Sequence, residues 1–282
     1  MYTEEDKNMV KAIMHGCNGH MGRVITDIIK NTEGIELVAG IDKYTKVPNE
    51  YPVFENIGAC DVEADVIIDF SNAAAADELL GYCVEKQVPV VLCTTGLSEE
   101  QLAKVEESAK KVAVLAVNPV NGCGLFQYLE AFFENGISYK VFAVSDTKEI
   151  KTNSGISLTA DDVIANLKGH EDEFDALVFS CGDAVPVFQQ NADKPYNVDL
   201  MQVIKTFGDK GKMMIGHCAG AMMFDFTGIT KGKKVAVHPL AKPAIQNGTA
   251  TDKKSEIDGN FFTAQDENTI WTMMPQVIEA LK

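Results

Sequence analysis

The chain of 282 residues lacks several features, and each absence argues against a class of protein. No apolar run approaches the roughly 18 residues that a membrane-spanning helix needs. No run of five basic residues occurs and the formal net charge is −16, which opposes binding to nucleic acid or to an anionic lipid surface. The cysteines show no Cys-x-x-Cys pair and no zinc-site spacing, so we expect no metal.

The seven cysteines are odd in number and scattered, which favours reduced thiols in a cytoplasmic protein over a disulfide framework. Residues 1–8 are polar and acidic, so we expect an unstructured lead-in there rather than a secretory or transit signal. At roughly 100–200 residues per domain, the length predicts two domains.

Short apolar segments alternate with amphipathic ones along the whole chain, which is typical of βαβ units and parallel sheets. We therefore predict an α/β fold with two doubly wound domains in tandem, the first Rossmann-like and the second flavodoxin-like. Strands are predicted at residues 11–14, 37–41, 66–68, 88–92, 112–117, 139–144, 176–179, 213–216, 235–238 and 261–263. Helices are predicted to end near residue 30 and to span residues 99–110, 125–134, 198–207 and 269–281.

The domain boundary depends on residues 112–117, which could be the fifth strand of the first sheet or the first strand of the second. In a doubly wound order the fifth strand is an edge strand and the first is central. A sheet without its central strand would lose hydrogen bonds to two neighbouring strands, whereas a sheet without an edge strand would lose hydrogen bonds to only one. We therefore assign this strand to the second domain, giving domains of residues 1–111 and 112–282, with about four strands in the first sheet.

The segment G-C-N-G-H-M-G at residues 16–22 follows a predicted strand and opens a predicted helix. Glycines in this position let the backbone approach a pyrophosphate at the helix N-terminus. Asp42 ends the second strand and is placed to accept from a ribose hydroxyl, whereas the adjacent Lys43 would favour a 2′-phosphate. The motif predicts NAD or NADP binding. The alternative is that the glycines serve only close packing.

This segment, together with D-F-S at residues 69–71 and T-T-G at residues 94–96, resembles the N-terminal domain of dihydrodipicolinate reductase over roughly residues 9–111. The family's paired histidine with a nearby lysine, and its D-A-P-S-G-T-A-like loop, are missing. The resemblance therefore implies cofactor binding without tetrahydrodipicolinate chemistry. The cofactor-binding residues that it implies are Gly16, Gly19, Met21, Gly22, Asp42, Lys43, Ser71, Thr94, Thr95 and Gly96.

A second motif, G-H-C-A-G at residues 216–220, lies where a predicted strand turns into a helix. Glycines two residues before and after the cysteine allow the sharp turn of a nucleophile elbow. The positive end of the helix dipole favours the thiolate. Cys218 is therefore the predicted nucleophile, the alternative being a small buried apolar residue. Neighbouring residues leave opposite sides of a strand, so we expect His217 to face away.

This turn, with residues 174–182 before it and H-P-L-A-K at residues 238–242 after it, resembles the ThiJ/PfpI superfamily and most closely its parkinsonism-associated deglycase branch. The resemblance covers about residues 112–282. It implies that Cys218 is the nucleophile and that the backbone N–H groups of Gly182 and Ala219 are oxyanion donors. It also implies that His238 lies near the cysteine and that the protein is a homodimer.

One residue of that family is missing here. The family places a glutamate against the thiol, but Gly124 stands near that position and no acid occurs between Asn118 and Glu130. Asp183 is a candidate replacement. Asn118 or Asn121 could hydrogen-bond the sulfur but cannot act as an acid.

Four functions fit these patterns. The first is an enzyme that uses Cys218 on a small carbonyl or acyl compound, in a glyoxalase-like or amidase-like reaction. The second is an NAD(P)H-dependent reductase related to 4-hydroxy-tetrahydrodipicolinate reductase. The third is a redox or stress-response module that is oxidised at Cys218. The fourth is a recombined fusion whose halves share no joint activity.

Overall fold

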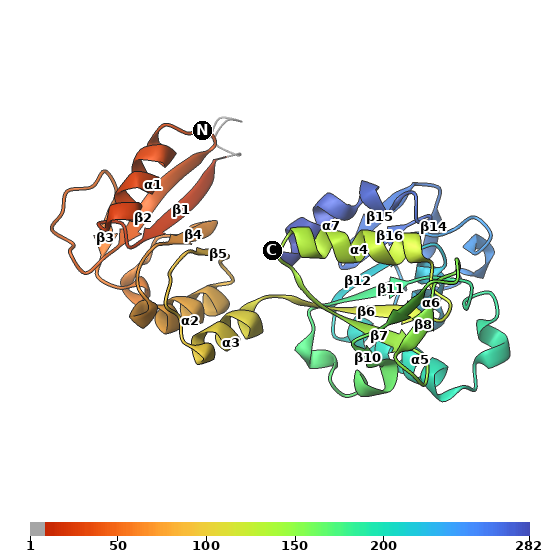
Figure 1. Ribbon diagram of the computed structural model, residues 1–282. Helices are drawn as coiled ribbons and strands as arrows, with labels where there is room; N and C mark the ends of the chain where they lie inside the picture. The colour runs from red at the N-terminus through yellow and green to blue at the C-terminus, as the bar shows by residue number, and fades with distance from the viewer. Residues whose placement is uncertain (1–8) are drawn as a thin grey trace. The chain divides into compact units, whose positions relative to one another are not determined.

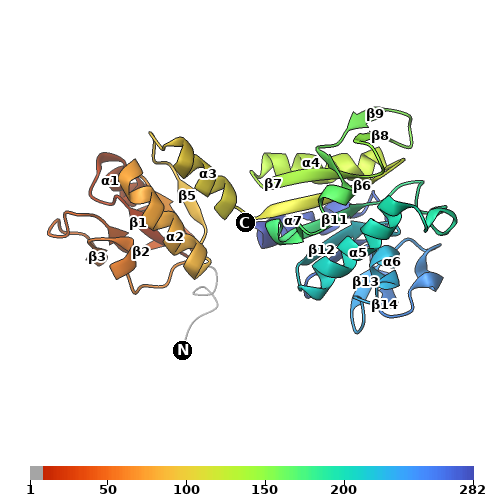
Figure 2. The same ribbon diagram turned by 90° about the horizontal axis from the view of Figure 1, so that it is seen from below.

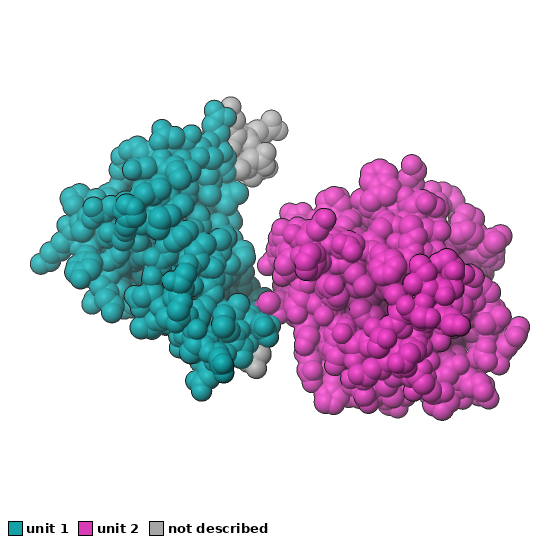
Figure 3. Space-filling view, viewed as in Figure 1, with its two compact units in different colours: residues 1–108 teal, residues 109–282 magenta. Residues whose placement is uncertain are grey.

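The computed structural model describes residues 9–282, so the predicted lead-in at residues 1–8 lies outside the described residues. The chain divides into two compact units, residues 1–108 and 109–282, which Figure 3 distinguishes by colour. Each unit has its own largely parallel sheet and its own hydrophobic core, which confirms the predicted fold class. Among the described residues, no helix has the length and apolar character needed to span a bilayer.

The first unit contains a parallel sheet of five strands in the order β3-β2-β1-β4-β5. The strands are β1 (Val10–His15), β2 (Ile35–Ile41), β3 (Val53–Phe54), β4 (Val66–Asp69) and β5 (Val90–Leu92). Helix α1 (His20–Lys30) covers one face, and α2 (Ala76–Lys86) and α3 (Glu99–Ser108) cover the other (Figures 1 and 2). The expectation of four strands missed β3, because a two-residue edge strand leaves no periodic signal.

Helix α3 begins where the sequence predicts. Ser98 and Gln101 form a reciprocal capping box, in which the Gln101 N–H donates to the Ser98 hydroxyl at 3.2 Å and the Ser98 N–H donates to the Gln101 side chain at 3.1 Å. The helix ends at Ser108, two residues earlier than predicted, because the chain becomes extended at Lys111.

The second unit contains a sheet of seven strands in the order β10-β7-β6-β11-β12-β16-β15, antiparallel only between the last two. Its strands are β6 (Lys111–Val117), β7 (Ser138–Val144), β10 (Asp162–Val163), β11 (Ala176–Ser180), β12 (Met213–His217), β15 (Ser255–Asp258) and β16 (Phe261–Ala264). Strand β6 lies between β7 and β11, so residues 112–117 are an interior strand of the second sheet, as expected.

Helices cover both faces of this sheet (Figure 1). Helices α4 (Gly122–Glu134) and α7 (Met274–Leu281) lie on one face, and α5 (Pro195–Asp209) and α6 (Gly220–Phe226) lie on the other. Strands β6 and β11 are accordingly buried along almost their whole length. Two small two-stranded sheets, β8 (Glu149–Lys151) with β9 (Ser157–Thr159) and β13 (Lys234–Ala236) with β14 (Thr249–Thr251), complete the unit.

Two predicted elements of the second unit differ in the structure. The strand predicted at residues 235–238 ends at Ala236, so His238 lies in the following loop. The helix predicted at residues 269–281 is divided into a short 3₁₀ turn at Ile270–Thr272 and helix α7. Pro275 accounts for the division, because proline is tolerated in the first turn of a helix but not in its interior.

Candidate functional site

Cys218 lies in the sharp turn between β12 and α6. Its φ is +57°, a left-handed conformation that residues other than glycine rarely adopt and that often marks functional sites. The turn is held by two backbone hydrogen bonds, from Cys218 N–H to the Ala264 carbonyl at 3.1 Å and from His238 N–H to the Cys218 carbonyl at 3.0 Å. The predicted elbow thus presents a half-buried thiol at the carboxyl end of the sheet.

A cavity of about 530 Å³, here called the cysteine cavity, opens beside this thiol and is lined by Cys218, Cys181 and His238 among others. Such a cavity, mainly apolar with a few converging polar groups, is typical of small-molecule sites. Its apolar wall consists of Val185, Pro186, Phe188, Met222, Phe226 and Leu240.

A second thiol, which the sequence analysis did not single out, lies against the first. Cys181 and Cys218 line the same cavity, and their thiols interact closely enough to shift each other's pKa. That interaction lowers the pKa of Cys218 in spite of its burial, and it raises the pKa of Cys181 well above the usual value. Cys181 stands next to the predicted Gly182, but only the pairing of β11 with β12 shows that the two cysteines meet.

The predicted oxyanion donors Gly182 and Ala219 both line the cysteine cavity. Hydrogen bonding to the backbone at Ala219 lowers the pKa of Cys218, and hydrogen bonding to the backbone at Ala219 and Gly182 partly offsets the rise in the pKa of Cys181. Glycine is required at Gly182, since a Cβ there would lie 2.2 Å from the Pro119 carbonyl oxygen.

His238 lies in the wall of the cysteine cavity. Its Nδ1 accepts a hydrogen bond from the Leu240 N–H at 3.3 Å. In the neutral ring this acceptor role leaves the proton on Nε2. The neutral ring can therefore donate a hydrogen bond from Nε2.

The space for a side chain at Gly124 is filled by His217. A Cβ on Gly124 would lie 2.3 Å from the His217 Nε2. The His217 ring is fully buried in the core, as expected, and neither nitrogen has a hydrogen-bond partner among the described residues. Burial lowers its pKa to about 4, so the ring is neutral at physiological pH.

Of the candidates considered in place of the missing glutamate, Asn121 and Asp183 line the cysteine cavity and Asn118 does not, and the one that carries a carboxylate is Asp183. It accepts a hydrogen bond from Asn153 Nδ2 at 3.0 Å. The side chains of the two asparagines instead accept hydrogen bonds from backbone N–H groups. Asn121 Oδ1 caps α4 by accepting from the Gly124 N–H at 2.8 Å, and Asn118 Oδ1 accepts from the Lys151 N–H at 3.0 Å.

A buried aspartate that the sequence analysis missed anchors one side of the site. Asp225 in α6 is 1% exposed and accepts from the N–H groups of Gln246 at 2.7 Å and Gly248 at 2.8 Å, and from the Thr230 hydroxyl. Burial raises its pKa, but these hydrogen bonds outweigh that effect and the pKa is lowered. Asp225 thereby fixes the segment that follows the His238 loop.

In the first unit, the glycine turn is built as the motif predicts. Gly16 has φ +83°, and a Cβ there would lie 2.6 Å from the Phe70 carbonyl oxygen. A Cβ on Gly22 would lie 2.1 Å from the Gly16 carbonyl oxygen, so packing alone already requires glycine at both positions. Asp42 closes the turn by accepting from the backbone N–H groups of Asn18 and Tyr44, each at 3.0 Å.

A buried carboxylate organises the other predicted cofactor residues. Asp69 contacts His15 Nδ1 at 2.6 Å, the Thr94 hydroxyl at 2.5 Å and the Ser71 N–H at 3.2 Å. Burial raises the pKa of Asp69, but the hydrogen bonds from His15, Ser71 and Thr94 prevail and lower it. The sequence analysis did not identify His15. The remaining predicted cofactor residues are exposed, namely Gly19, Met21, Lys43, Thr95 and Gly96.

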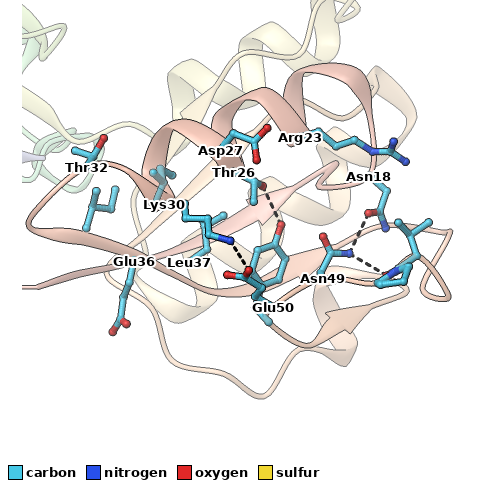
Figure 4. Close-up of a pocket in the computed structure, with 15 residues that line it drawn as sticks. Asn18, Arg23, Thr26, Asp27, Lys30, Thr32, Glu36, Leu37, Asn49 and Glu50 are labelled. Atoms are coloured by element: carbon cyan, nitrogen blue, oxygen red, sulfur yellow. Dashed lines mark hydrogen bonds and ion pairs between the residues drawn. The ribbon is translucent and has the colours of Figure 1, made fainter.

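A larger cavity of about 640 Å³ lies in the first unit, beside α1 and the segment at residues 47–51 (Figure 4). The Lys30–Glu50 ion pair and a 2.9 Å hydrogen bond between the Thr26 and Tyr51 hydroxyls lie in it. Of the glycine turn at residues 16–22, this cavity is lined by Asn18 only, and Asp69 and its hydrogen-bond partners do not line it. Its size therefore does not make it the predicted cofactor cradle.

Comparison with known proteins identifies both halves of the chain. A model of the DJ-1/PfpI family matches residues 110–280, and a model of the dihydrodipicolinate reductase N-terminus matches residues 10–119. Protein ppBat of Bacteroides thetaiotaomicron is 92% identical over 174 residues, which are 62% of this chain and 99% of that protein. A crystal structure described as a candidate protease I from the same organism has a TM-score of 0.61 and 92% identity, covering 62% of this chain and 100% of that one.

The first half has relatives of a different kind. The 4-hydroxy-tetrahydrodipicolinate reductase of Clostridium novyi is 39% identical over 157 residues, which are 53% of this chain and 62% of that protein. This chain therefore spans about three-fifths of that reductase. Taken together, these matches show that the chain belongs to the DJ-1/PfpI family through residues 110–280 and carries before them a Rossmann-like domain of the dihydrodipicolinate reductase N-terminal type.

Proposed function

We propose that Cys218 is a nucleophile toward a small carbonyl or acyl compound bound in the cysteine cavity. The observation that carries this proposal is a thiol with a lowered pKa, held at a left-handed turn, that opens onto a 530 Å³ cavity. A thiolate is the reactive form of cysteine, so a lowered pKa increases the reactive fraction at neutral pH.

The cavity favours a carbonyl group that carries an apolar substituent. The thiolate adds to the carbonyl carbon, a C–S bond forms, and the carbonyl π electrons move to the oxygen. That oxygen takes a proton from the Cys181 thiol and accepts a hydrogen bond from the His238 Nε2–H, and both residues line the cavity. The substituent packs on the apolar wall around Phe188 and Met222.

Turnover of methylglyoxal and of p-nitrophenyl acetate tests this proposal. We expect Cys218→Ser to reduce turnover roughly a thousandfold or more, because loss of a nucleophile removes the covalent route. Cys123→Ser is the matched control, since Cys123 is exposed on α4 and lies outside the cavity lining. Turnover that is equal in Cys218→Ser and in the unmodified protein would refute the assignment.

We further propose that the first unit binds NAD or NADP. The glycine turn at the start of α1, the Asp42 carboxylate beside it and the family match support this function. When bound, such a cofactor supplies a hydride. The glycine turn would hold its pyrophosphate, and Asp42, whose carboxylate retains lone pairs for a hydroxyl, would hold its ribose.

Fluorescence titration with NADH and with NADPH tests the cofactor site and decides between the two. We expect saturable binding of at least one of them, and weaker binding in Asp42→Ala. Absence of saturable binding of either up to roughly millimolar concentration, far weaker than a typical micromolar site, would remove the proposal.

A further inference from the structure

The two thiols of the cysteine cavity are placed for a covalent bond to each other. Strands β11 and β12 are parallel neighbours in which Val178 pairs with Ile215 and Phe179 with Gly216. The ladder ends at that pair, and the same register continued for two residues would bring Cys181 beside Cys218. Neighbouring strands lie about 4.8 Å apart, and a disulfide needs a Cα–Cα separation of roughly 4.4–6.8 Å. Both side chains line the same cavity.

The surroundings of Cys181 keep it a neutral thiol until it reacts. The neighbouring Cys218 side chain and burial raise its pKa well above the usual value, and hydrogen bonding to the backbone at Ala219 and Gly182 offsets this only in part. Cys181 is only 3% exposed, whereas Cys218 is half-buried at the cavity. An oxidant entering the cavity therefore meets Cys218 first and leaves Cys181 as the second thiol.

We propose that Cys181 and Cys218 form a reversible disulfide through which the second unit reduces hydroperoxides. The Cys218 thiolate attacks a peroxide oxygen, an S–O bond forms and the O–O bond breaks. The leaving hydroxide or alkoxide takes a proton and departs as water or alcohol. Cys218 is thereby oxidised to the sulfenic acid and the peroxide is reduced.

The second step closes the disulfide. The Cys181 sulfur attacks the sulfenic sulfur of Cys218, an S–S bond forms, the S–O bond breaks, and the departing hydroxide combines with the Cys181 proton to give water. A low-molecular-weight thiol, consumed as two equivalents, returns both cysteines to the reduced form by thiol–disulfide exchange. This activity goes beyond the proposed carbonyl chemistry, with which it shares the reactive Cys218 thiolate and the neighbouring Cys181 thiol.

Intact-mass analysis and peptide mapping of the full chain after addition of hydrogen peroxide test the proposal. We expect the unmodified protein to lose about 2 Da and to yield a Cys181–Cys218 cross-linked peptide that dithiothreitol removes. Cys181→Ser should instead gain about 16 or 32 Da at Cys218, as sulfenic or sulfinic acid. Cys123→Ser should behave like the unmodified protein. With dithiothreitol present, one protein molecule should consume more than one equivalent of peroxide.

Three results would overturn the proposal. These are a sulfinic acid on Cys218 in the unmodified protein at the rate seen in Cys181→Ser, a disulfide mapped to another pair, or no peroxide consumption beyond one equivalent. The last two are measured on the unmodified chain alone, so they hold even if Cys181→Ser does not fold. Rapid alkylation of Cys218 without disulfide formation would refute this inference alone, whereas failure of Cys218 to alkylate would refute the nucleophile proposal as well.

Discussion

At the scale of single residues, one glycine and one histidine of the second unit share a space. Gly124 has no room for a Cβ because the His217 ring lies where that carbon would be. A helix interior ordinarily favours alanine over glycine by about 1 kcal/mol, so the glycine is retained against propensity. The glutamate that the ThiJ/PfpI family carries near this position would therefore clash with the His217 ring in this chain.

We predict that Gly124→Ala destabilises the second unit by about 1–3 kcal/mol, because overpacking outweighs the gain in helix propensity. The cost should shrink when His217→Ala is present, since the clash is then removed. Urea denaturation of the two single variants and the double variant measures this coupling. Additive effects would show that the two side chains do not compete for the same space.

A second residue-scale prediction concerns Asp69, whose pKa is lowered in the folded protein. A carboxyl with a lowered folded pKa stabilises the fold above its unfolded pKa, about 3.9, and that stabilisation is lost as the pH falls through the folded pKa. We expect the melting temperature of the first unit to fall below about pH 4, and Asp69→Asn to weaken this dependence. An unchanged pH profile in Asp69→Asn would contradict the assignment.

The sequence predicted the functional residues that are marked by their own neighbours in the chain. It did not predict the residues whose role depends on a partner in an adjacent strand. Cys218 was identified from its flanking glycines, and Asp42 from its place after a strand. Cys181 and His15 matter because of partners on neighbouring strands, 37 and 54 positions away in the sequence. A single sequence does not give that register.

At the scale of elements, the alternation of strands and helices was sufficient to predict both sheets. The short segments were missed, because β3, β10 and β14 offer too few residues for a periodic pattern. The loop that carries His238 has no periodic pattern of apolar residues either, so its course could not be predicted from the sequence. It is positioned by β13 before it and by the Asp225 hydrogen bonds after it.

We predict that Asp225→Asn loosens the segment at residues 246–248, because an amide replaces one acceptor oxygen with donors that face backbone N–H groups. Leaving buried N–H groups without an acceptor costs about 1–3 kcal/mol. Hydrogen exchange at these residues should accelerate, while exchange in β6 stays slow. Equal protection of residues 246–248 in both proteins would show that Asp225 does not anchor them.

At the scale of the whole molecule, the chain combines two units with separate cores and separate relatives. Residues 110–119 match both family models, and the structure assigns most of them to the second sheet through β6. The relative that is 92% identical over 174 residues is matched along 99% of its own length, so the second unit corresponds to a whole protein elsewhere.

Because each unit has its own hydrophobic core, we expect two unfolding transitions in calorimetry. We expect NADH or NADPH, whichever binds, to raise the melting temperature of the first unit and to leave that of the second unchanged, because a ligand stabilises only the fold that binds it. A single transition that shifts as a whole with the cofactor would show instead that the units unfold together.

The chemistry proposed for the second unit requires Cys218 to ionise more readily than a free cysteine, and the alkylation rate of Cys218 as a function of pH measures this property. Iodoacetamide labelling of the full chain, followed by mass spectrometry of the Cys218 peptide, should give an apparent pKa below the value of about 8.5 for free cysteine. Replacing Cys181 with alanine should raise it, because the interaction of the Cys181 thiol with the Cys218 thiolate is lost. An apparent pKa at or above 8.5 for Cys218, unmoved by Cys181→Ala, would contradict the account.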